Sequence, residues 1–134
     1  MTDAREVKPN RLYTRDHEWT LSKGSTVLIG ITAFAVDQLG DITLVDLTVT
    51  EGMHLDAHQV FGTIESVKTL SDLFSPVSGT VVRVNPELVE HPELVNDDCW
   101  DKAWMIELAP ENAPQAGDEL LDAAAYASHL EQAG

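Results

Sequence analysis

The stretch ESVKTLSDLFSPVSG, residues 65–79, sets one lysine between two apolar runs that both end in turn signals. Residues 60–67 read as a β-strand, and residues 70–74 read as its returning partner. A strand pair joined in this way places the intervening residues at a hairpin tip. We therefore expect Lys68 at an exposed tip, where its amine can enter the active site of another protein.

Lys68 is also isolated in charge, because it is the only Lys or Arg between Lys23 and Arg83. An ordinary surface lysine is the simplest interpretation of such a residue. The lack of any neighbouring cation in the sequence weakens that interpretation. Composition and spacing leave the role of Lys68 open.

The rest of the chain predicts a mostly β fold. Strand patterns cover residues 27–31, 41–49, 80–84 and 104–108. A short helix is expected between Thr32, which caps its start, and Gly40, which ends it. An alanine-rich helix is expected over about residues 118–130. Short, closely spaced strands favour an antiparallel sandwich or barrel, and a length of 134 residues predicts one domain, 1–134, with its core at about residues 11–110.

The chain is strongly acidic, with 23 Asp plus Glu against 8 Lys plus Arg and a net charge of −15. Such a surface repels phosphate backbones and anionic lipids, so we expect neither nucleic acid nor membrane as a partner. Residues 85–134 hold twelve acids and one base, Lys102. Two interpretations remain open: a solubilising face, or a docking surface for basic partners.

Cysteine content and the N-terminus bear on location. Cys99 is the only cysteine, which fits a reducing compartment. No apolar run is long enough to span a membrane, and residues 1–13 resemble neither a secretory signal nor a transit peptide. We expect a cytoplasmic, bacterial-type protein.

The remaining sequence motifs do not indicate a catalytic or metal-binding site. The stretch HLDAH, residues 54–58, has two histidines at metal-ligand spacing, but its last three residues, Asp56-Ala57-His58, read as a polar turn rather than part of a metal site. No elbow motif frames a nucleophilic serine, and no phosphate-binding glycine loop is present. Neighbouring aspartates disfavour a thiolate at Cys99. We expect no catalytic residue and no metal.

The run Glu-Ser-Val-Lys, followed by Ser-Asp and then Ser-Pro-Val-Ser-Gly, resembles the lipoyl-carrier signature of the H-protein family of the glycine cleavage system. Further blocks are similar to the same family over roughly residues 11–130. They are the His-Glu-Trp segment within residues 13–19, Gly-Ile-Thr at 30–32, Asp-Gln-Leu-Gly-Asp-Ile at 37–42, Val-Asn at 84–85, Pro-Glu-Leu-Val-Asn at 92–96 and Trp-Met-Ile at 104–106.

The resemblance implies a lipoyl/biotinyl-carrier-like barrel-sandwich hybrid with short helices and a C-terminal helix. It implies lipoic acid in amide linkage to Lys68 of a non-catalytic carrier. The carrier would take the aminomethyl group of glycine from a pyridoxal-phosphate (PLP) glycine decarboxylase to a tetrahydrofolate-dependent aminomethyltransferase. A dihydrolipoamide dehydrogenase with FAD and NAD would then reoxidise it, and a lipoate ligase or lipoyl/octanoyl transferase would attach the arm.

The family's arm-receiving cleft nominates Glu18, Asp72 and Asp16 as its polar lining in this chain. The alternative is that these three residues are ordinary surface acids with no role in binding the arm. Glu65 and Asp72 flank the tip, where they either guide the modifying enzyme or simply hydrate the turn. Cys99-Trp100 departs from the family's usual Pro followed by Tyr, which leaves the conformation and partner contacts of that loop open.

Competing functions remain open. A related lipoyl-relay carrier would hand lipoate to other proteins instead of serving glycine oxidation. An enzyme with Lys68 as a Schiff-base nucleophile would need that lysine desolvated in a pocket. Asp-Lys-Ala and Met-Lys-Met, the tips of 2-oxo acid dehydrogenase lipoyl domains and of biotin carriers, are absent. We expect a monomer.

Overall fold

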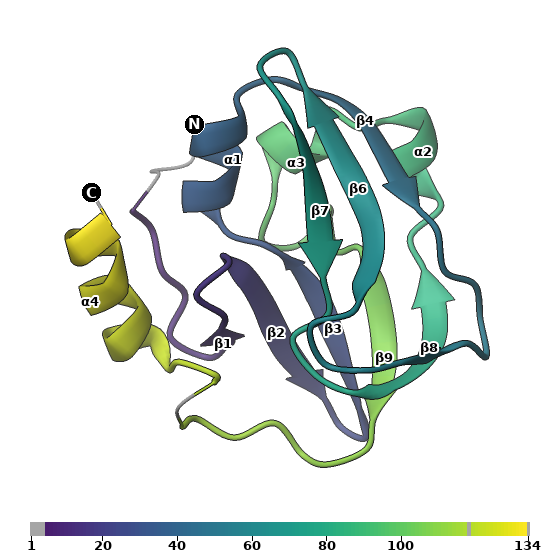
Figure 1. Ribbon diagram of the computed structural model, residues 1–134, viewed down its shortest axis with the longest axis vertical. Coiled ribbons are helices and arrows are strands. Elements are labelled where there is room, and N and C mark those ends of the chain that lie inside the picture. The colour runs from purple at the N-terminus through teal and green to yellow at the C-terminus, as the bar shows by residue number, and fades with distance from the viewer. Residues whose placement is uncertain (1–4, 118, 134) are drawn as a thin grey trace.

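The computed structural model describes residues 5–117 and 119–133, which form two antiparallel β-sheets with helices around them (Figure 1). The strands are β1 (Leu12–Tyr13), β2 (Glu18–Lys23), β3 (Thr26–Ile31), β4 (Ile42–Leu47), β5 (His54–Leu55), β6 (Val60–Ser66), β7 (Leu70–Phe74), β8 (Gly79–Val84) and β9 (Ile106–Pro110). The helices are α1 (Ala33–Leu39), α2 (Glu87–Glu90), α3 (Leu94–Asp97) and α4 (Ala123–Ala133). The large sheet has the order β1-β2-β3-β9-β8-β5, and the small sheet has the order β4-β6-β7.

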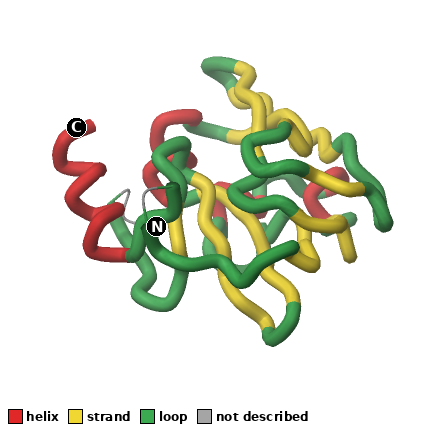
Figure 2. The backbone as a smooth tube through the Cα atoms, turned by 60° about the horizontal axis from the view of Figure 1, so that its bottom comes forward, coloured by secondary structure: helices red, strands yellow, loops and turns green. Residues whose placement is uncertain are grey.

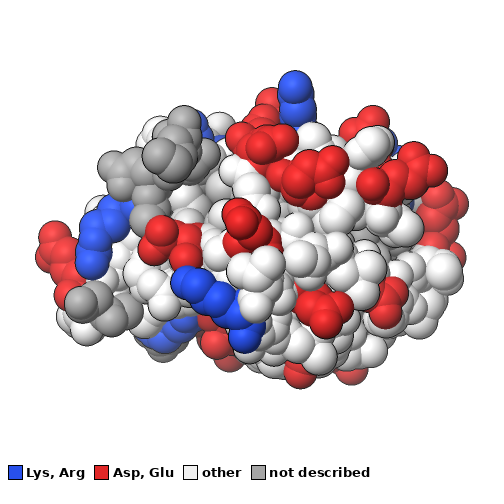
Figure 3. Space-filling model, turned by 90° about the horizontal axis from the view of Figure 1, so that it is seen from above, with Lys and Arg blue, Asp and Glu red and all other residues white. Residues whose placement is uncertain are grey.

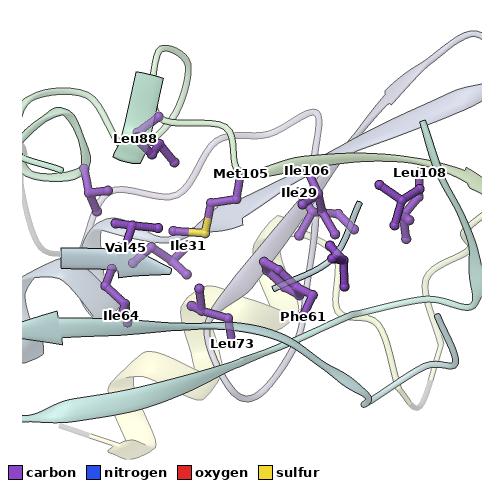
Figure 4. Close-up of a cluster of buried hydrophobic side chains, with 14 of the residues drawn as sticks. Ile29, Ile31, Val45, Phe61, Ile64, Leu73, Leu88, Met105, Ile106 and Leu108 are labelled. Atoms are coloured by element: carbon purple, nitrogen blue, oxygen red, sulfur yellow. The ribbon is translucent and has the colours of Figure 1, made fainter. Parts of the chain in front are cut away.

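The main core lies between the two sheets. Val45, Ile64 and Leu73 from the small sheet meet Ile29 and Ile106 from the large sheet, and all five side chains are buried (Figure 4). Alternation along β6 and β7 directs one set of side chains into this core and the other set outward. The predicted antiparallel barrel-sandwich fold is confirmed.

Two glycines allow neighbouring paired strands to approach each other closely. A Cβ atom on Gly62 would lie 2.5 Å from the carbonyl oxygen of Asp46, and one on Gly79 would lie 2.5 Å from that of Ala109. Such contacts are too short for any side chain, so glycine is required where these backbones approach.

A second, aromatic cluster packs beneath the C-terminal helix. Tyr13 of β1 stacks on Tyr126 of α4 with ring centroids 4.4 Å apart. Figure 2 shows α4 at the outer edge of the molecule, and a backbone bridge between Tyr13 and Leu121 leads the chain into it. The helix begins later than the expected residue 118, which itself lies outside the described residues. Asp122 caps it, because its Oδ1 accepts a hydrogen bond from the amide of Ala125 at 2.9 Å.

The expected strands and the first helix are present with small shifts. The hairpin of β6 and β7, strand β3, helix α1 and strand β8 confirm the predictions. The last expected strand is displaced by two residues, to Ile106–Pro110. The polar turn expected at Asp56-Ala57-His58 is present, and the two residues before it, His54 and Leu55, form β5. Within the described ranges, no helix has the length and apolar character needed to cross a bilayer.

Candidate functional site

Lys68 lies at the tip of the hairpin formed by β6 and β7, at one extremity of the molecule (Figure 1). The hydroxyl of Ser66 accepts hydrogen bonds from the backbone amides of Lys68 at 3.1 Å and Thr69 at 3.2 Å. The amide of Ser66 also donates to the carbonyl of Thr69 at 2.8 Å. A single serine therefore holds the turn while Val67, Lys68 and Thr69 remain exposed.

The stem of Lys68 rests on the loop that follows α1. A Cβ atom on Gly40 would lie 3.4 Å from Cε of Lys68, so the lysine packs where a side chain is missing. The amide of Val67 donates to the carbonyl of Asp41 at 3.0 Å, which anchors the tip to the same loop. No carboxylate in the described part of the chain lies within ion-pair distance of the Lys68 ammonium. The tip is thus fixed while its amine stays available.

A cleft of about 280 Å³ lies between α1, the start of β2 and strand β7. A second hollow of about 360 Å³ adjoins it. The structure brings the three nominated acids, Asp16, Glu18 and Asp72, together in the lining of both. The apolar side of the cleft comes from Ile31, Phe34, Leu39, Ile64 and Leu73. Glu65 does not line it and stays exposed on β6.

Lys68 and the cleft are joined by one strand. Asp72 is two residues from Leu70, where β7 begins, a separation of about 7 Å along an extended strand. A flexible group attached to Lys68 can therefore follow β7 down to Asp72.

Glu18 differs from the other two acids because it is only 3% exposed. The hydroxyl of Thr14 donates to Oε1 of Glu18 at 2.6 Å. Burial raises the pKa of Glu18 to about 7, nearby Asp16 acts in the same direction, and hydrogen bonds from Thr14 and the backbone of Phe74 oppose both. Asp16 and Asp72 are exposed, so the cleft has one buried carboxyl between two hydrated ones.

His17 is a cleft residue that the sequence reasoning did not nominate. Its backbone has a φ of +73°, a left-handed conformation usual for glycine at the end of a tight hairpin loop. Its ring lies 4.6 Å from the ring of Phe34, and its Nδ1 lies 2.8 Å from the hydroxyl of Tyr126. Burial lowers the pKa of His17, His129 lowers it further, and Asp16 raises it. The sequence feature that could have nominated His17 as a cleft residue is its position next to Glu18 in the His-Glu-Trp segment.

Cys99 and Trp100, which replace the family's usual Pro followed by Tyr, are both buried in the aromatic cluster. The guanidinium of Arg11 lies 4.8 Å from the ring of Trp19 and 5.4 Å from that of Trp100. The indole of Trp100 donates to Glu6 at 2.9 Å. Burial, followed by Asp98, raises the pKa of the Cys99 thiol to about 12, so the thiol stays protonated.

The histidines of residues 54–58 pair with acids rather than with a metal set. His54 lies 3.0 Å from Asp56, and His58 lies 3.7 Å from Glu119. Across residues 5–117 and 119–133, no group of three or more His, Cys, Asp or Glu side chains is arranged to hold a metal ion.

Comparison with known proteins gives consistent relatives. Residues 11–133 match the family described as "Glycine cleavage H-protein". A "Glycine cleavage system H protein" from Magnetococcus marinus is 52% identical over 119 residues, which cover 89% of this chain and 84% of that protein. One of the same name from Bacteroides fragilis is 53% identical over 117 residues, 87% of this chain and 91% of the relative. A crystal structure of a glycine cleavage system H protein from Mycobacterium marinum superposes with a TM-score of 0.82 at 35% identity and covers 93% of this chain and 99% of that one.

Proposed function

The chain belongs to the glycine cleavage H-protein family, and from that premise we propose that Lys68 is its site of lipoyl attachment. The chain is a non-catalytic carrier protein of the glycine cleavage system. The observation that carries the attachment site is that Lys68 is exposed on a hydrogen-bonded hairpin tip, next to the strand that leads to an acid-lined cleft. An exposed primary amine can be acylated, and lysine alone supplies one on a flexible stem.

The residues present fit a lipoyl arm. When attached, that arm carries the aminomethyl group of glycine between enzymes and is then reoxidised. Lys68 provides the tether, which makes each encounter with an active site of a docked partner effectively intramolecular. Ser66 and Asp41 fix the position of the tether, so the mobile part of the assembly begins at the lysine side chain.

Glu18, Asp72 and Asp16 form the polar lining that would receive a cationic group on the arm. A carboxylate pairs with an ammonium through a charge-assisted hydrogen bond, which strengthens where water is scarce. Ile31, Phe34 and Leu73 supply the water-excluding wall. Buried Glu18 is the strongest candidate for this pairing, because the exposed Asp16 and Asp72 stay hydrated.

The specific partners belong to the same proposal. They are the PLP glycine decarboxylase, the folate-dependent aminomethyltransferase, the dihydrolipoamide dehydrogenase and a lipoate ligase or lipoyl/octanoyl transferase. The carrier that binds them is proposed to be monomeric and cytoplasmic. Acidic side chains are spread over the face seen from above (Figure 3). If the twelve acids of residues 85–134 steer basic partners, the association rate falls between low and physiological salt. An association rate that does not change with salt would leave the acids as a solubility device.

The function is tested in a reconstituted glycine cleavage assay. The lipoylated chain, with the three partner enzymes, should release carbon dioxide and ammonia from glycine and reduce NAD. The unlipoylated chain should support none of this turnover. Lipoate transfer from the chain to a second apo-acceptor, without glycine turnover, would instead establish the lipoyl-relay function.

A further inference from the structure

The C-terminal helix α4 contacts a cleft residue, His17, through the hydroxyl group of Tyr126. Tyr126 of α4 is fully buried, and its hydroxyl lies 2.8 Å from Nδ1 of His17 and 2.7 Å from Oγ1 of Thr32. Thr32 is the N-cap of α1, and its Oγ1 accepts a hydrogen bond from the amide of Ala35 at 3.3 Å. A continuous set of hydrogen bonds therefore runs from the first turn of α1, through α4, to the cleft.

The direction of these bonds follows from counting donors. Thr32 is 0% exposed, and the hydrogen bonds among the described residues offer its hydroxyl proton no acceptor other than Tyr126. Donation from Thr32 to Tyr126 leaves the phenol proton to bond Nδ1 of His17. The opposite direction would place a proton on Nδ1 and leave the buried proton of Thr32 unpaired, which is costly.

We infer that Tyr126 holds His17 as the neutral imidazole protonated on Nε2, so that the acid-lined cleft has no competing positive charge from this ring. His17 is then a positioning residue that acts through its charge state. The consequence for the arm rests on the proposed function, but the tautomer of His17 does not.

The other groups around His17 support a ring held in one state. Arg15, Asp16 and Glu18 lie on its own segment, Asp72 faces the cleft from β7, and His129 of α4 is 5.7 Å away between ring centroids. The tilted contact with Phe34 and the left-handed backbone of His17 fix where the ring lies. Burial already lowers the pKa of this histidine, and a hydrogen bond donated to its unprotonated nitrogen acts in the same direction.

The test uses ¹⁵N NMR of the histidine side chains in the unlipoylated protein. Nδ1 of His17 should show the shift of an unprotonated nitrogen at neutral pH, and Nε2 that of a protonated one. Tyr126→Phe keeps the stacked ring but removes the phenol proton. In that variant the pKa of His17 should rise toward that of an ordinary histidine, and the tautomer should become mixed.

A matched control is available within the same aromatic stack. Tyr13→Phe removes the other buried hydroxyl, which bonds to the backbone of Lys8, and should leave the His17 signals unchanged. A protonated Nδ1 in the wild-type protein would overturn the inference without any variant. An unchanged His17 pKa in a folded Tyr126→Phe protein would also overturn it.

A second readout separates this inference from the proposed function. The second readout is the lifetime of the carried group in the loaded, lipoylated protein. At pH values where His17 is protonated in the Tyr126→Phe variant but neutral in the wild type, the variant should shorten this lifetime about twofold or more. Tyr13→Phe should not. If the His17 signals change but that lifetime does not, the tautomer inference stands and the placement of the arm in the cleft is refuted.

Discussion

The hairpin tip and the cleft are neighbouring parts of one site that are built in opposite ways. The tip is a single segment, residues 65–70, held mainly by the hydroxyl of Ser66. The cleft takes its walls from separate segments: residues 16–18, 31–39, 64 and 71–73. The turn at the tip forms through local hydrogen bonds, with one anchor from the Val67 amide to the carbonyl of Asp41, whereas the cleft exists only when both sheets and α1 have packed.

The difference also separates their chemistry. Lys68 is exposed and carries its charge in water. Glu18 is 3% exposed, and burial alters its protonation. A local segment can present a reactive group, but a perturbed carboxyl needs a tertiary fold around it. Variants at Lys68 and Ser66 test the tip, and variants at Glu18 test the cleft.

The largest effect is expected at the tip. Lys68→Arg keeps the positive charge but has no primary amine, so lipoylation should fall to zero while folding is unchanged. The intact mass of protein isolated from cells reports the modification directly. Lys23→Arg is the control and should be modified as fully as the wild type. Lipoyl remaining on the Lys68→Arg protein would refute the assignment.

The next largest effect is expected in the cleft and concerns stability. The pKa of Glu18 is about 7 in the folded state against 4.5 as its ordinary value, so the folded protein holds a proton that the unfolded chain releases. The free energy of unfolding therefore falls as pH rises through this window, by up to about 3 kcal/mol. Glu18→Gln cannot ionise. Its stability advantage over wild type should grow from near zero at about pH 4 to this amount at about pH 8.

Urea unfolding at both pH values measures that difference. Asp72→Asn is the control, because Asp72 is exposed and its replacement should give no comparable pH-dependent gain. A Glu18→Gln difference that stays constant with pH would mean that Glu18 is not perturbed by burial.

The same Glu18→Gln variant should weaken retention of a cation in the cleft. A hydrogen bond to a charged partner contributes more than a neutral one, so the lifetime of the aminomethyl-loaded protein should fall about tenfold. Release of formaldehyde and ammonia, with no transferase present, reports that lifetime. Glu65→Gln is the control, since Glu65 lies outside the cleft. Equal release from the wild type and the Glu18→Gln protein would remove Glu18 from the arm-binding role.

The smallest effect is expected from the turn itself. Ser66→Ala removes the acceptor of two backbone amides, which water can partly replace at the surface, so stability should fall by about 1 kcal/mol. Lipoylation should slow about two- to threefold because the tip is less ordered. Thr69→Ala loses only one long bond, of 3.5 Å, and should show less than half of either effect. Equal effects in both variants would show that Ser66 does not hold the turn.

The same contrast explains what the sequence could predict. The hairpin of β6 and β7 follows from a local pattern, and the same pattern places Lys68 at its tip. Strand β2 has no counterpart in the sequence prediction, although Glu18 to Ser22 alternate polar and apolar residues. The burial of the polar residues Glu18 and Thr20 does not follow from that alternation, because it arises from packing. Helices α2 and α3 have four residues each, too few for helical periodicity to show.

The cleft depended on more than local pattern. Asp16, Glu18 and Asp72 were nominated through the family resemblance, since nothing in their spacing indicates that residues on two different sheets meet. The perturbed carboxyl and the contact between His17 and Tyr126 come from packing between distant segments. Asp122, the cap of α4, was a local signal that would have placed the start of that helix correctly.

The pairing of Glu65 with Leu70 also determines which side chains of β7 face the core and which face outward. Neighbouring residues of a strand face opposite sides, so one residue inserted between Leu70 and Asp72, with the pairing of Glu65 and Leu70 kept, would exchange inside for outside along the rest of β7. Leu73 would then turn toward solvent and Asp72 toward the core. Insertions in pairs would preserve the facing but move the lysine farther from the cleft. The count of residues from lysine to acid is thus as much a part of the site as the residues themselves.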